Sequence, residues 1–414
     1  MLLIRLAWRS LWRNRRRSLI AIAAVVFAMF LSIVQMGIED GTHTVSIRTA
    51  VRLSTGFIQI QKVGYNKTPT LQKCFAADPQ IEEALKSDPR ITGSSPRIQS
   101  DGLLSFADHS VGAMIMGVSP KTEKAITDFP SRINSGRFLT DGSSPEIVVG
   151  YRLLQNLGAK VGDSVVVLAQ GFDGVLGNMF VRIVGTFKTG ADEFDRMGTF
   201  MNITSLQNFL GMSAETIGSD RVNAIAISVK DPGDVEDVVN KLNPILKPMG
   251  LVALPWQVLL PQLEQTMEFD HAGNVLFIII LLVVVGFGIL NTVLMSITER
   301  FREYGVMLAL GMKHGNLALA VFIEVFFMLL IGFFFGNLLG LGINYYFVTH
   351  PITLGGDMAK LYLEYGFAPI IPSSVAFRIF VQSTVIILAI SIGATVYPLW
   401  RVARLEPLKG IRYT

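Results

Sequence analysis

The chain has 414 residues, half of them hydrophobic, and a formal net charge of +4 at pH 7. Its only cysteine, Cys74, excludes an internal disulfide framework. The positive charge belongs to short basic segments that border long apolar runs, and this arrangement predicts no nucleic-acid partner.

Residues 1–18 form a basic segment without an acidic residue. Its arginines recur every three or four positions, whereas Ile4, Trp8, Leu11 and Trp12 fall on another face. This periodicity predicts an amphipathic cytoplasmic helix that lies in the plane of the lipid headgroups. The same charges also fit simple anchoring of the apolar run that follows, and the two interpretations are compatible.

Four apolar runs reach the length of a membrane-spanning helix, roughly 20 residues for about 30 Å of hydrocarbon. They cover residues 19–38, 274–296, 317–343 and 376–397. We therefore expect four transmembrane helices. The first run exceeds the apolar core of a cleavable signal peptide and no A-x-A-like cleavage site follows it, so we expect it to remain as an anchor.

Lysine and arginine in the loops predict the orientation of these helices. Basic residues gather in three segments, 1–18, 297–316 and 398–414. The loop 344–375, by contrast, contains a single basic residue, Lys360. Both termini are therefore expected in the cytoplasm, and residues 39–273 and 344–375 are expected on the other side of the membrane.

Residues 39–273 are long enough to form one or two globular domains. The segments GFIQIQK and AIAISVK are strand-like, and each is followed by a helical pattern and a second strand-like segment. These two patterns predict a split α+β domain with the intervening residues inserted. The predicted fold is thus an α-helical membrane domain of four transmembrane helices, with a large α+β extracytoplasmic domain inserted between helices 1 and 2. The polar segment 261–271 is expected to be a stalk that leads into the second span.

The sequence lacks the motifs of the common catalytic and metal sites. It has no Gly-Lys dipeptide and hence no phosphate-binding loop of the G-x-x-x-x-G-K-[ST] type. Its histidines are scattered without H-E-x-x-H or Cys/His metal spacing, and no G-x-S-x-G elbow occurs. We therefore expect no catalytic residue, no metal site and no cofactor bound by this chain.

The third predicted span contains an acidic residue and a row of glycines. Glu324 lies about 10 Å from the cytoplasmic end, where a carboxylate costs about 2.5–3.5 kcal/mol on insertion scales. An interhelical hydrogen bond explains this residue better than a proton relay, because the spans contain no second acid to receive a proton. Gly332, Gly336 and Gly340 recur at a spacing that lets another helix backbone approach closely.

The loop between the second and third spans has a helical pattern of its own. Its sequence ERFREYGVMLALGMKHG (residues 299–315) alternates charged and apolar residues, so it is too amphipathic for a plain loop and too charged to enter lipid. Such a segment fits a short cytoplasmic helix that docks into another protein. A helix that rests on the membrane is the alternative.

Several segments along nearly the whole chain resemble one family of membrane proteins. They are RLAWRSLWRNRRRS (5–18), MIMGVSP (114–120), EIVVGYRLLQNLGAKVGDSVVV (146–167), VRIVGTFKTGADEFDRMGTFMNITSLQNFLGM (181–212), the loop segment above, VFIEVFFMLLIGFFFGNLLG (321–340) and YPLWRVARLEPLKGIRY (397–413). In combination they resemble the permease subunits of the MacB/FtsX/LolCDE superfamily of ABC transporters. The segments between residues 114 and 212 resemble the lipoprotein-release branch, LolC and LolE, in particular.

The resemblance implies a half-transporter of the bacterial inner membrane. Two permease copies or paralogues would pair into an eight-helix dimer, and two separate ATPase subunits would bind ATP and Mg and carry out the hydrolysis. The family's coupling helix, which sits in a groove of the ATPase, would contain the matching residues Glu299, Arg300, Arg302, Glu303, Gly305 and Gly311. Glu324 coincides with the family's usual acid in the third span.

Three functions are consistent with this resemblance. The leading hypothesis is the release of lipoproteins from the inner membrane, driven by mechanotransmission from the ATPase to the periplasmic domain. The alternatives are MacB-like export of peptides or small amphiphiles with periplasmic adaptors, and FtsX-like signalling to a periplasmic partner. One permease of the lipoprotein-release branch holds a soluble carrier with a proline-bounded hairpin, whereas the corresponding segment GFDGVLGN (171–178) contains no proline. The resemblance does not name the cargo or decide between a homodimer and a heterodimer.

Overall fold

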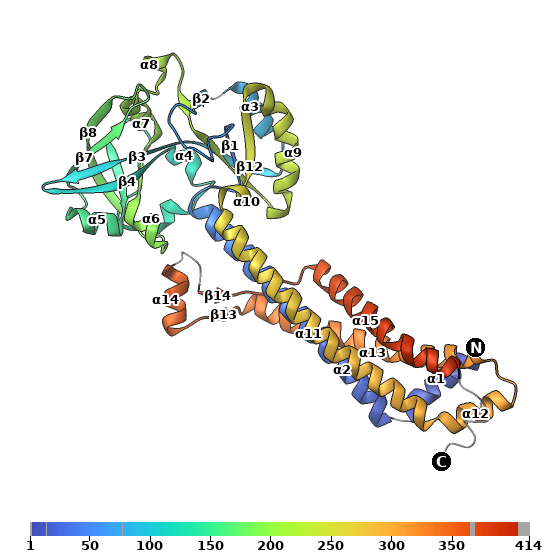
Figure 1. Cartoon of the computed structure of the whole chain (residues 1–414). Coiled ribbons are helices and arrows are strands. Elements are labelled where there is room, and N and C mark those ends of the chain that lie inside the picture. Colours follow the sequence, from blue (N-terminus) through green and yellow to red (C-terminus); the bar gives the residue numbers. More distant parts are fainter. Residues whose placement is uncertain (1, 14, 77, 365–368, 405–414) are drawn as a thin grey trace. The chain divides into compact units, whose positions relative to one another are not determined.

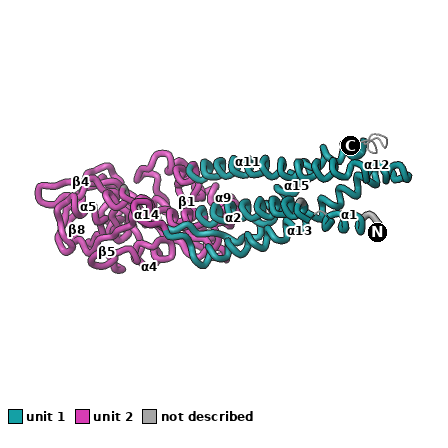
Figure 2. The backbone as a smooth tube through the Cα atoms, turned by 90° about the horizontal axis from the view of Figure 1, so that it is seen from below, with its two compact units in different colours: residues 1–43, 266–353, 370–414 teal, residues 44–265, 354–369 magenta. Residues whose placement is uncertain are grey.

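The computed structural model describes residues 2–13, 15–76, 78–364 and 369–404 (Figure 1). The chain forms two compact units (Figure 2). Residues 1–43, 266–353 and 370–414 make up a helical unit, and residues 44–265 and 354–369 make up an α/β unit. Helices α2 (Arg15–Leu53) and α11 (Pro261–Glu299) each contribute residues to both units.

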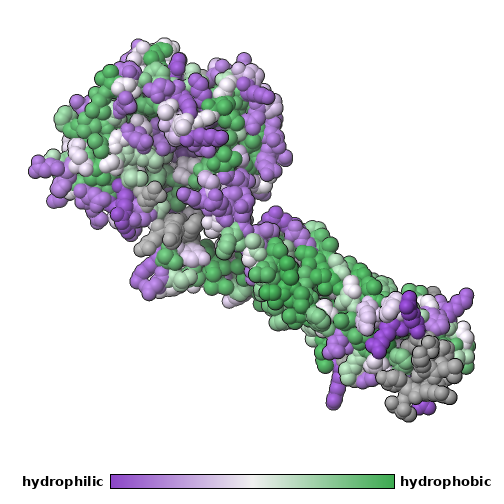
Figure 3. Space-filling model, in the orientation of Figure 1, coloured by the Kyte–Doolittle hydropathy of each residue, from purple (hydrophilic) through white to green (hydrophobic). Residues whose placement is uncertain are grey.

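The helical unit is built around long apolar helices. Within the described residues, four helices are long and apolar enough to cross a membrane, namely α2, α11, α13 (His314–Thr349) and α15 (Phe377–Ala403). Shorter helices α1 (Leu2–Arg13) and α12 (Phe301–Ala309) accompany them, as does a small ribbon of β13 (Ile352–Thr353) and β14 (Ile370–Ile371). Figure 3 shows a broad apolar surface over the long helices, which is the surface that lipid would cover.

The apolar runs lie inside helices that are longer than the predicted spans. α2 has 39 residues and continues through the polar segment 39–53, while the segment 261–271, predicted as a stalk, forms the first turns of α11. A helix of this length measures about 58 Å, roughly twice the thickness of the hydrocarbon layer. The predicted loop 344–375 likewise contains the last turns of α13 and helix α14 (Gly356–Glu364). Hydropathy marks the part of a helix that lipid can cover, whereas backbone hydrogen bonding continues beyond it.

α2 and α13 pack closely along a row of glycines on α13. A Cβ atom added at any of these glycines would lie within 2.7 Å of a side chain on α2. The glycines Gly332, Gly336 and Gly340 face, in turn, Val25, Met29 and Ile33. A larger residue would push the two helices apart, so the row serves contact between two helices of the same chain.

The α/β unit contains a sheet with the strand order β12-β1-β11-β3, in which all neighbours are antiparallel. These strands are β1 (Ile58–Lys62), β3 (Ile91–Phe106), β11 (Ala224–Val229) and β12 (Leu251–Pro255). Helix α3 (Pro79–Lys86) connects β1 to β3, and helix α9 (Val235–Leu246) connects β11 to β12. This is the ferredoxin-like split arrangement, and both strand–helix–strand patterns seen in the sequence are present.

Residues 107–223 are inserted between the two halves and contribute strands that close on themselves. Strands β4 (His109–Val118), β9 (Gly198–Asn202), β6 (Glu146–Gly150), β8 (Leu176–Phe187) and β7 (Ser164–Gln170) pair in this order, and β7 returns to β3. β5 (Ile133–Gly136) pairs with β8. The long strand β3 belongs to both groups, because its first half pairs with β11 and its second half with β7.

Short elements connect and cover these strands. They are β2 (Phe75–Ala76), which pairs with β10 (Arg221–Val222), and the helices α4 (Pro120–Glu123), α5 (Tyr151–Leu157), α6 (Asp192–Met197), α7 (Ile203–Leu210), α8 (Ala214–Ile217) and α10 (Trp256–Leu259). The inserted strands enclose an aromatic cluster in which the rings of Phe129 and Phe200 lie 4.2 Å apart and Phe187 and Phe194 pack beside them. Burial of these large rings stabilises the insertion as a core of its own.

A buried carboxylate joins the two helices of the split domain. Asp88, just after α3, accepts hydrogen bonds from Arg90 Nη2 over 2.8 Å and from Lys241 Nζ of α9 over 3.1 Å. The hydrogen bond from the Arg90 guanidinium holds the pKa of Asp88 well below its usual range, although burial of the carboxylate opposes the shift. Asp88 therefore remains ionised and fixes the end of α3 to α9.

Candidate coupling site

Helix α12 follows a buried arginine that joins three helices. The side chain of Arg300, the residue before α12, is only 7% exposed. Its Nη1 atom donates to Oε2 of Glu324 on α13 over 3.0 Å. Ser10 of α1 donates from Oγ to the same carboxylate oxygen over 2.6 Å, and Arg300 donates in turn to both Oγ and the main-chain carbonyl of Ser10. The start of α12, the last turn of α1 and the first half of α13 thus meet at one carboxylate.

The burial of both charges makes this contact energetically important. Glu324 is 10% exposed, and a carboxylate in such surroundings is stable only with a cation or hydrogen-bond donors beside it. Arg300 supplies the cation and Ser10 supplies a neutral donor. The contact is an interhelical hydrogen bond, the role that the sequence favours for Glu324 over a proton relay. Removal of either ion would leave the other buried without a partner of opposite charge.

A second ion pair connects α1 to α12 at the surface. Arg13 Nη2 donates to Oε1 and Oε2 of Glu303 over 2.8 Å and 2.5 Å. Both side chains are about half exposed, so this pair contributes little stability by itself.

Tyr304 follows Glu303 on α12 and is buried, and this burial raises the pKa of its hydroxyl. A cavity of about 260 Å³ separates α1 from α12 and is lined in part by Arg9, Arg13 and Tyr304.

The structure separates the predicted coupling residues by exposure. Arg302 and Glu303 are exposed on α12, whereas Gly305 is buried. Glu299 is the last residue of α11, and Gly311 lies beyond α12 in a turn where its φ of 96° suits glycine. The helix is therefore shorter than the predicted segment 297–316.

Arg300 does not lie on the exposed side of α12. The family resemblance places it on the coupling helix, whereas in the structure it immediately precedes α12 and its guanidinium points inward to Glu324 and Ser10. The spacing of charges in a loop does not reveal which of them pairs with an acid 24 residues later, and this pairing turns Arg300 away from solvent. Leu310, 84% exposed at the end of α12, is a better candidate for the docking face.

Sequence reasoning missed Ser10 and Arg13 as partners of this site. Both lie in the basic segment whose charges suggest contact with lipid headgroups, and each finds its partner about 290 residues away. The available signal was the unpaired carboxylate at Glu324, which called for a donor but did not identify it. Trp8 also faces α13, with its ring centroid 5.4 Å from that of Phe327.

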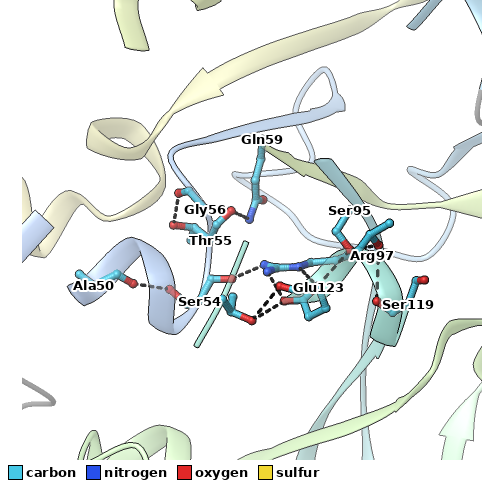
Figure 4. A network of polar contacts seen from close by, with 11 residues as sticks. Ala50, Ser54, Thr55, Gly56, Gln59, Ser95, Arg97, Ser119 and Glu123 are labelled. Carbon is cyan, nitrogen blue, oxygen red and sulfur yellow. Dashed lines mark hydrogen bonds and ion pairs between the residues drawn. The ribbon is translucent and has the colours of Figure 1, made fainter. Parts of the chain in front are cut away.

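A second buried ion pair lies in the α/β unit (Figure 4). Arg97 of β3 donates from Nη2 to Oε1 of Glu123 over 2.6 Å, and the Glu123 side chain is fully buried. Ser95 and Thr127 donate to the same carboxylate over 3.1 Å and 2.8 Å. Arg97 also donates from Nη1 to the carbonyl of Ser54, the residue after α2. A cation at this position is favourable because the carbonyl groups at a helix C-terminus carry partial negative charge.

Comparison with known proteins identifies the family. Residues 18–245 match the model of the MacB-like periplasmic core domain, and residues 275–407 match the model of the FtsX-like permease C-terminal. The chain belongs to the LolC/MacB/FtsX family of ABC transporter permeases. The family resemblance of the sequence segments is thereby confirmed.

Individual relatives of this permease come from two branches. The lipoprotein-releasing system transmembrane protein LolC of Xylella fastidiosa is 24% identical over 337 residues, which cover 79% of each chain. The macrolide export ATP-binding/permease protein MacB of Acinetobacter baylyi is 22% identical over 365 residues. These residues cover 81% of this chain and 50% of MacB. The crystal structure of the periplasmic region of MacB from Actinobacillus actinomycetemcomitans matches 52% of this chain and 93% of its own, with 15% identity and a TM-score of 0.35.

Family membership fits the architecture of the permease. The MacB-like model covers most of α2 and the α/β unit as far as residue 245, and the FtsX-like model covers most of α11 and all of α12, α13 and α15. Four apolar helices and a MacB-like periplasmic domain agree with the predicted fold class. Members of this family are generally non-catalytic subunits of ABC transporters.

Proposed function

We propose that this permease belongs to an ATP-driven machine that extracts lipoproteins from the bacterial inner membrane and releases them on the periplasmic side. Two separate ATPase subunits bind ATP and Mg in this proposal, and the permease pairs with a second copy or a paralogue. Both termini lie in the cytoplasm and residues 39–273 lie in the periplasm. The permease itself contributes no catalytic residue and acts as the moving part.

The observation that carries this proposal is the anchoring of α12 to α13 and α1. Arg300, at the start of α12, donates to Glu324 on α13 and to the main-chain carbonyl of Ser10 on α1. A force applied to α12 by a partner therefore reaches two other helices through close polar contacts. α13 passes the force on to α2 along the glycine row, where the two helices pack so closely that an added Cβ would clash.

The exposed side of α12 offers a docking surface of suitable chemistry. Arg302, Val306 and Leu310 are exposed there, so charged and apolar groups alternate at the surface. A short helix of this kind fits a groove in another protein, where Leu310 would be buried and Arg302 would meet acidic groups at the rim. We assign this surface to the contact with the ATPase.

The similarity to LolC supports lipoproteins as the cargo. It extends over 79% of both chains, and that relative bears the description of a lipoprotein-releasing protein. Reconstitution of the permease and its ATPase in liposomes that contain a triacylated lipoprotein would test the proposal. We expect ATP-dependent transfer of the lipoprotein to a soluble acceptor, and absence of transfer with a hydrolysing ATPase present would reject it.

MacB-like export of peptides or small amphiphiles is the second candidate. The match of residues 18–245 to the MacB-like domain and the 22% identity to MacB favour it. Capture of a periplasmic adaptor and an outer-membrane channel by the purified permease, without a lipoprotein, would support this function instead. FtsX-like signalling would show a third result, activation of a periplasmic partner in the absence of any cargo.

A further inference from the structure

One face of the split sheet in the α/β unit is unusually polar for a buried surface. In β1, Gln59 and Gln61 alternate with buried isoleucines, so both amides project from the same face. The strand register places Gln61, Ala224 and Arg97 in one row across β1, β11 and β3, and Gln59, Ala226 and Ser95 in the next row. Each of these residues is buried. Amides and small residues thus occupy positions where a sheet normally presents large apolar side chains.

A cavity of about 300 Å³ lies over this face. Its polar lining includes Gln59, Gln61, Asn223 and Tyr65, and its apolar lining includes Met114, Met116 and Phe194. The two alanines of β11 provide little side-chain bulk between β1 and β3, which leaves space above the sheet. The volume is at the lower end of the range of about 300–1,000 Å³ found for sites that hold small molecules.

Two buried amide atoms of residues that line the cavity lack hydrogen-bond partners among the described residues. Gln59 Nε2 donates to the carbonyl of Thr55, which leaves Gln59 Oε1 to accept from Gln61 Nε2 over 2.7 Å. Gln61 Oε1 is then an acceptor without a donor. Asn223 Oδ1 accepts from the main-chain N–H of Gln99 over 3.2 Å, and its Nδ2 is a donor without an acceptor.

These two atoms define what a ligand would have to supply. The carbonyl of Thr55 can only accept, which fixes the orientation of the Gln59 amide and, through it, that of the Gln61 amide. The N–H of Gln99 can only donate, which fixes the orientation of the Asn223 amide. Gln61 and Asn223 are 3% and 1% exposed, and buried polar groups of native proteins are almost always paired. A ligand with one donor and one acceptor would satisfy both atoms.

The charge of the lining excludes a strongly charged ligand. Arg97 is the one charged residue in the described lining, and Glu123 neutralises it in a fully buried pair. Burial, together with the charge of Asp101, raises the pKa of Tyr65 to about 12, so its phenol is uncharged at neutral pH. An ion entering this cavity would lose its hydration without gaining a counter-charge.

We propose that this cavity binds an uncharged peptide segment. A peptide unit has one N–H for Gln61 Oε1 and one carbonyl for Asn223 Nδ2, which matches the unpaired atoms in number and kind. A saccharide brings several hydroxyl donors, and the described lining contains no free carboxylate to accept them. The side chains of Met114 and Met116 adapt their shape to different neighbours, so the site would tolerate variation in the peptide sequence.

This inference deepens the proposed function, since it gives the periplasmic domain a contact with the polypeptide part of a cargo. Its test does not involve the ATPase. The full permease in lipid nanodiscs is titrated with an acetylated and amidated trialanine peptide, and binding is followed by saturation-transfer NMR. We expect saturable binding in the unmodified chain. Gln61→Met and Asn223→Leu should each weaken it about twofold to tenfold, the effect of one lost hydrogen bond.

The matched control is Gln155→Met on the exposed surface of α5, which should leave binding unchanged. Should a cavity variant fail to fold, the unmodified chain gives a second readout, in which a diazirine-labelled trialanine peptide should crosslink to Met114 or Met116. Crosslinks confined to other regions, binding of N-acetylglucosamine but not of the peptide, or no binding of the peptide would each overturn the proposal. Peptide binding without lipoprotein release would count against the proposed function alone.

Discussion

The buried pair of Arg300 and Glu324 gives the sharpest quantitative prediction. Arg300→Met removes the cation and leaves the carboxylate, which is 10% exposed, with the hydroxyl of Ser10 as its remaining side-chain donor among the described residues. Breaking a buried ion pair in this way destabilises proteins by about 3–5 kcal/mol, because the remaining ion stays desolvated. Glu324→Leu should have a similar effect for the same reason. The double variant removes both charges, so it should be more stable than either single variant.

The measurement is a double-mutant cycle on the detergent-solubilised permease. The free energy of unfolding is obtained from SDS titrations followed by tryptophan fluorescence, to which Trp8 contributes from its position against Phe327. Glu324→Gln serves as a control, since the amide can still accept from Ser10 while no negative charge remains. We expect it to be intermediate between the parent and Glu324→Leu.

The coupling between the two positions decides whether the reasoning holds. If the decreases in the free energy of unfolding of the two single variants add up in the double variant, the two charges do not depend on each other and the ion pair has no structural role. If Arg300→Met lowered the free energy of unfolding by less than about 1 kcal/mol, that result would also contradict the buried geometry, because losses of that size are typical of ion pairs at the surface.

Three further predictions concern packing, pH and coupling. Gly336→Ala places a Cβ 2.4 Å from a side chain of α2 and should lower the unfolding temperature, whereas Gly342→Ala, with open space around it, should leave it unchanged or raise it. Asp88 has a lowered pKa in the folded state, so its stabilisation is complete above the ordinary value of about 3.9 and is lost as the pH falls toward the folded-state pKa. Asp88→Asn should therefore destabilise the chain at pH 7, and its difference from the parent in unfolding titrations should shrink below about pH 4. Charge reversal by Arg302→Glu with Glu303→Arg should lower ATP-dependent release at least about tenfold while membrane insertion stays normal.

The charge reversal has a matched control within the chain. Glu82 and Lys86 form an exposed ion pair on α3, and exchange of these two residues alters charge on a helix that we do not place at an interface. Release should be unchanged in that variant. Normal ATPase association and release after reversal at Arg302 and Glu303 would show that α12 docks elsewhere or through its apolar residues alone.

Much of the layout follows from the sequence because it depends on local composition. Four apolar runs lie inside the four long helices, since the length that spans lipid is readable from hydropathy. The two strand–helix–strand patterns form one split sheet, because alternation in strands and periodicity in α3 and α9 are local properties. The ends of the helices were less predictable, as the helical course of residues 39–53 shows.

The sequence by itself determined which segments can enter a membrane, the strand and helix periods of the α/β unit, and the family resemblance. The tertiary structure alone decided the partners of the buried polar groups. Nothing local connects Glu324 to Ser10, or Gln61 to a cavity shared with Asn223, because these pairs arise from chain segments that lie far apart in sequence. Burial then turns such contacts into strong constraints, since an ion or amide removed from water must find its partner inside the protein.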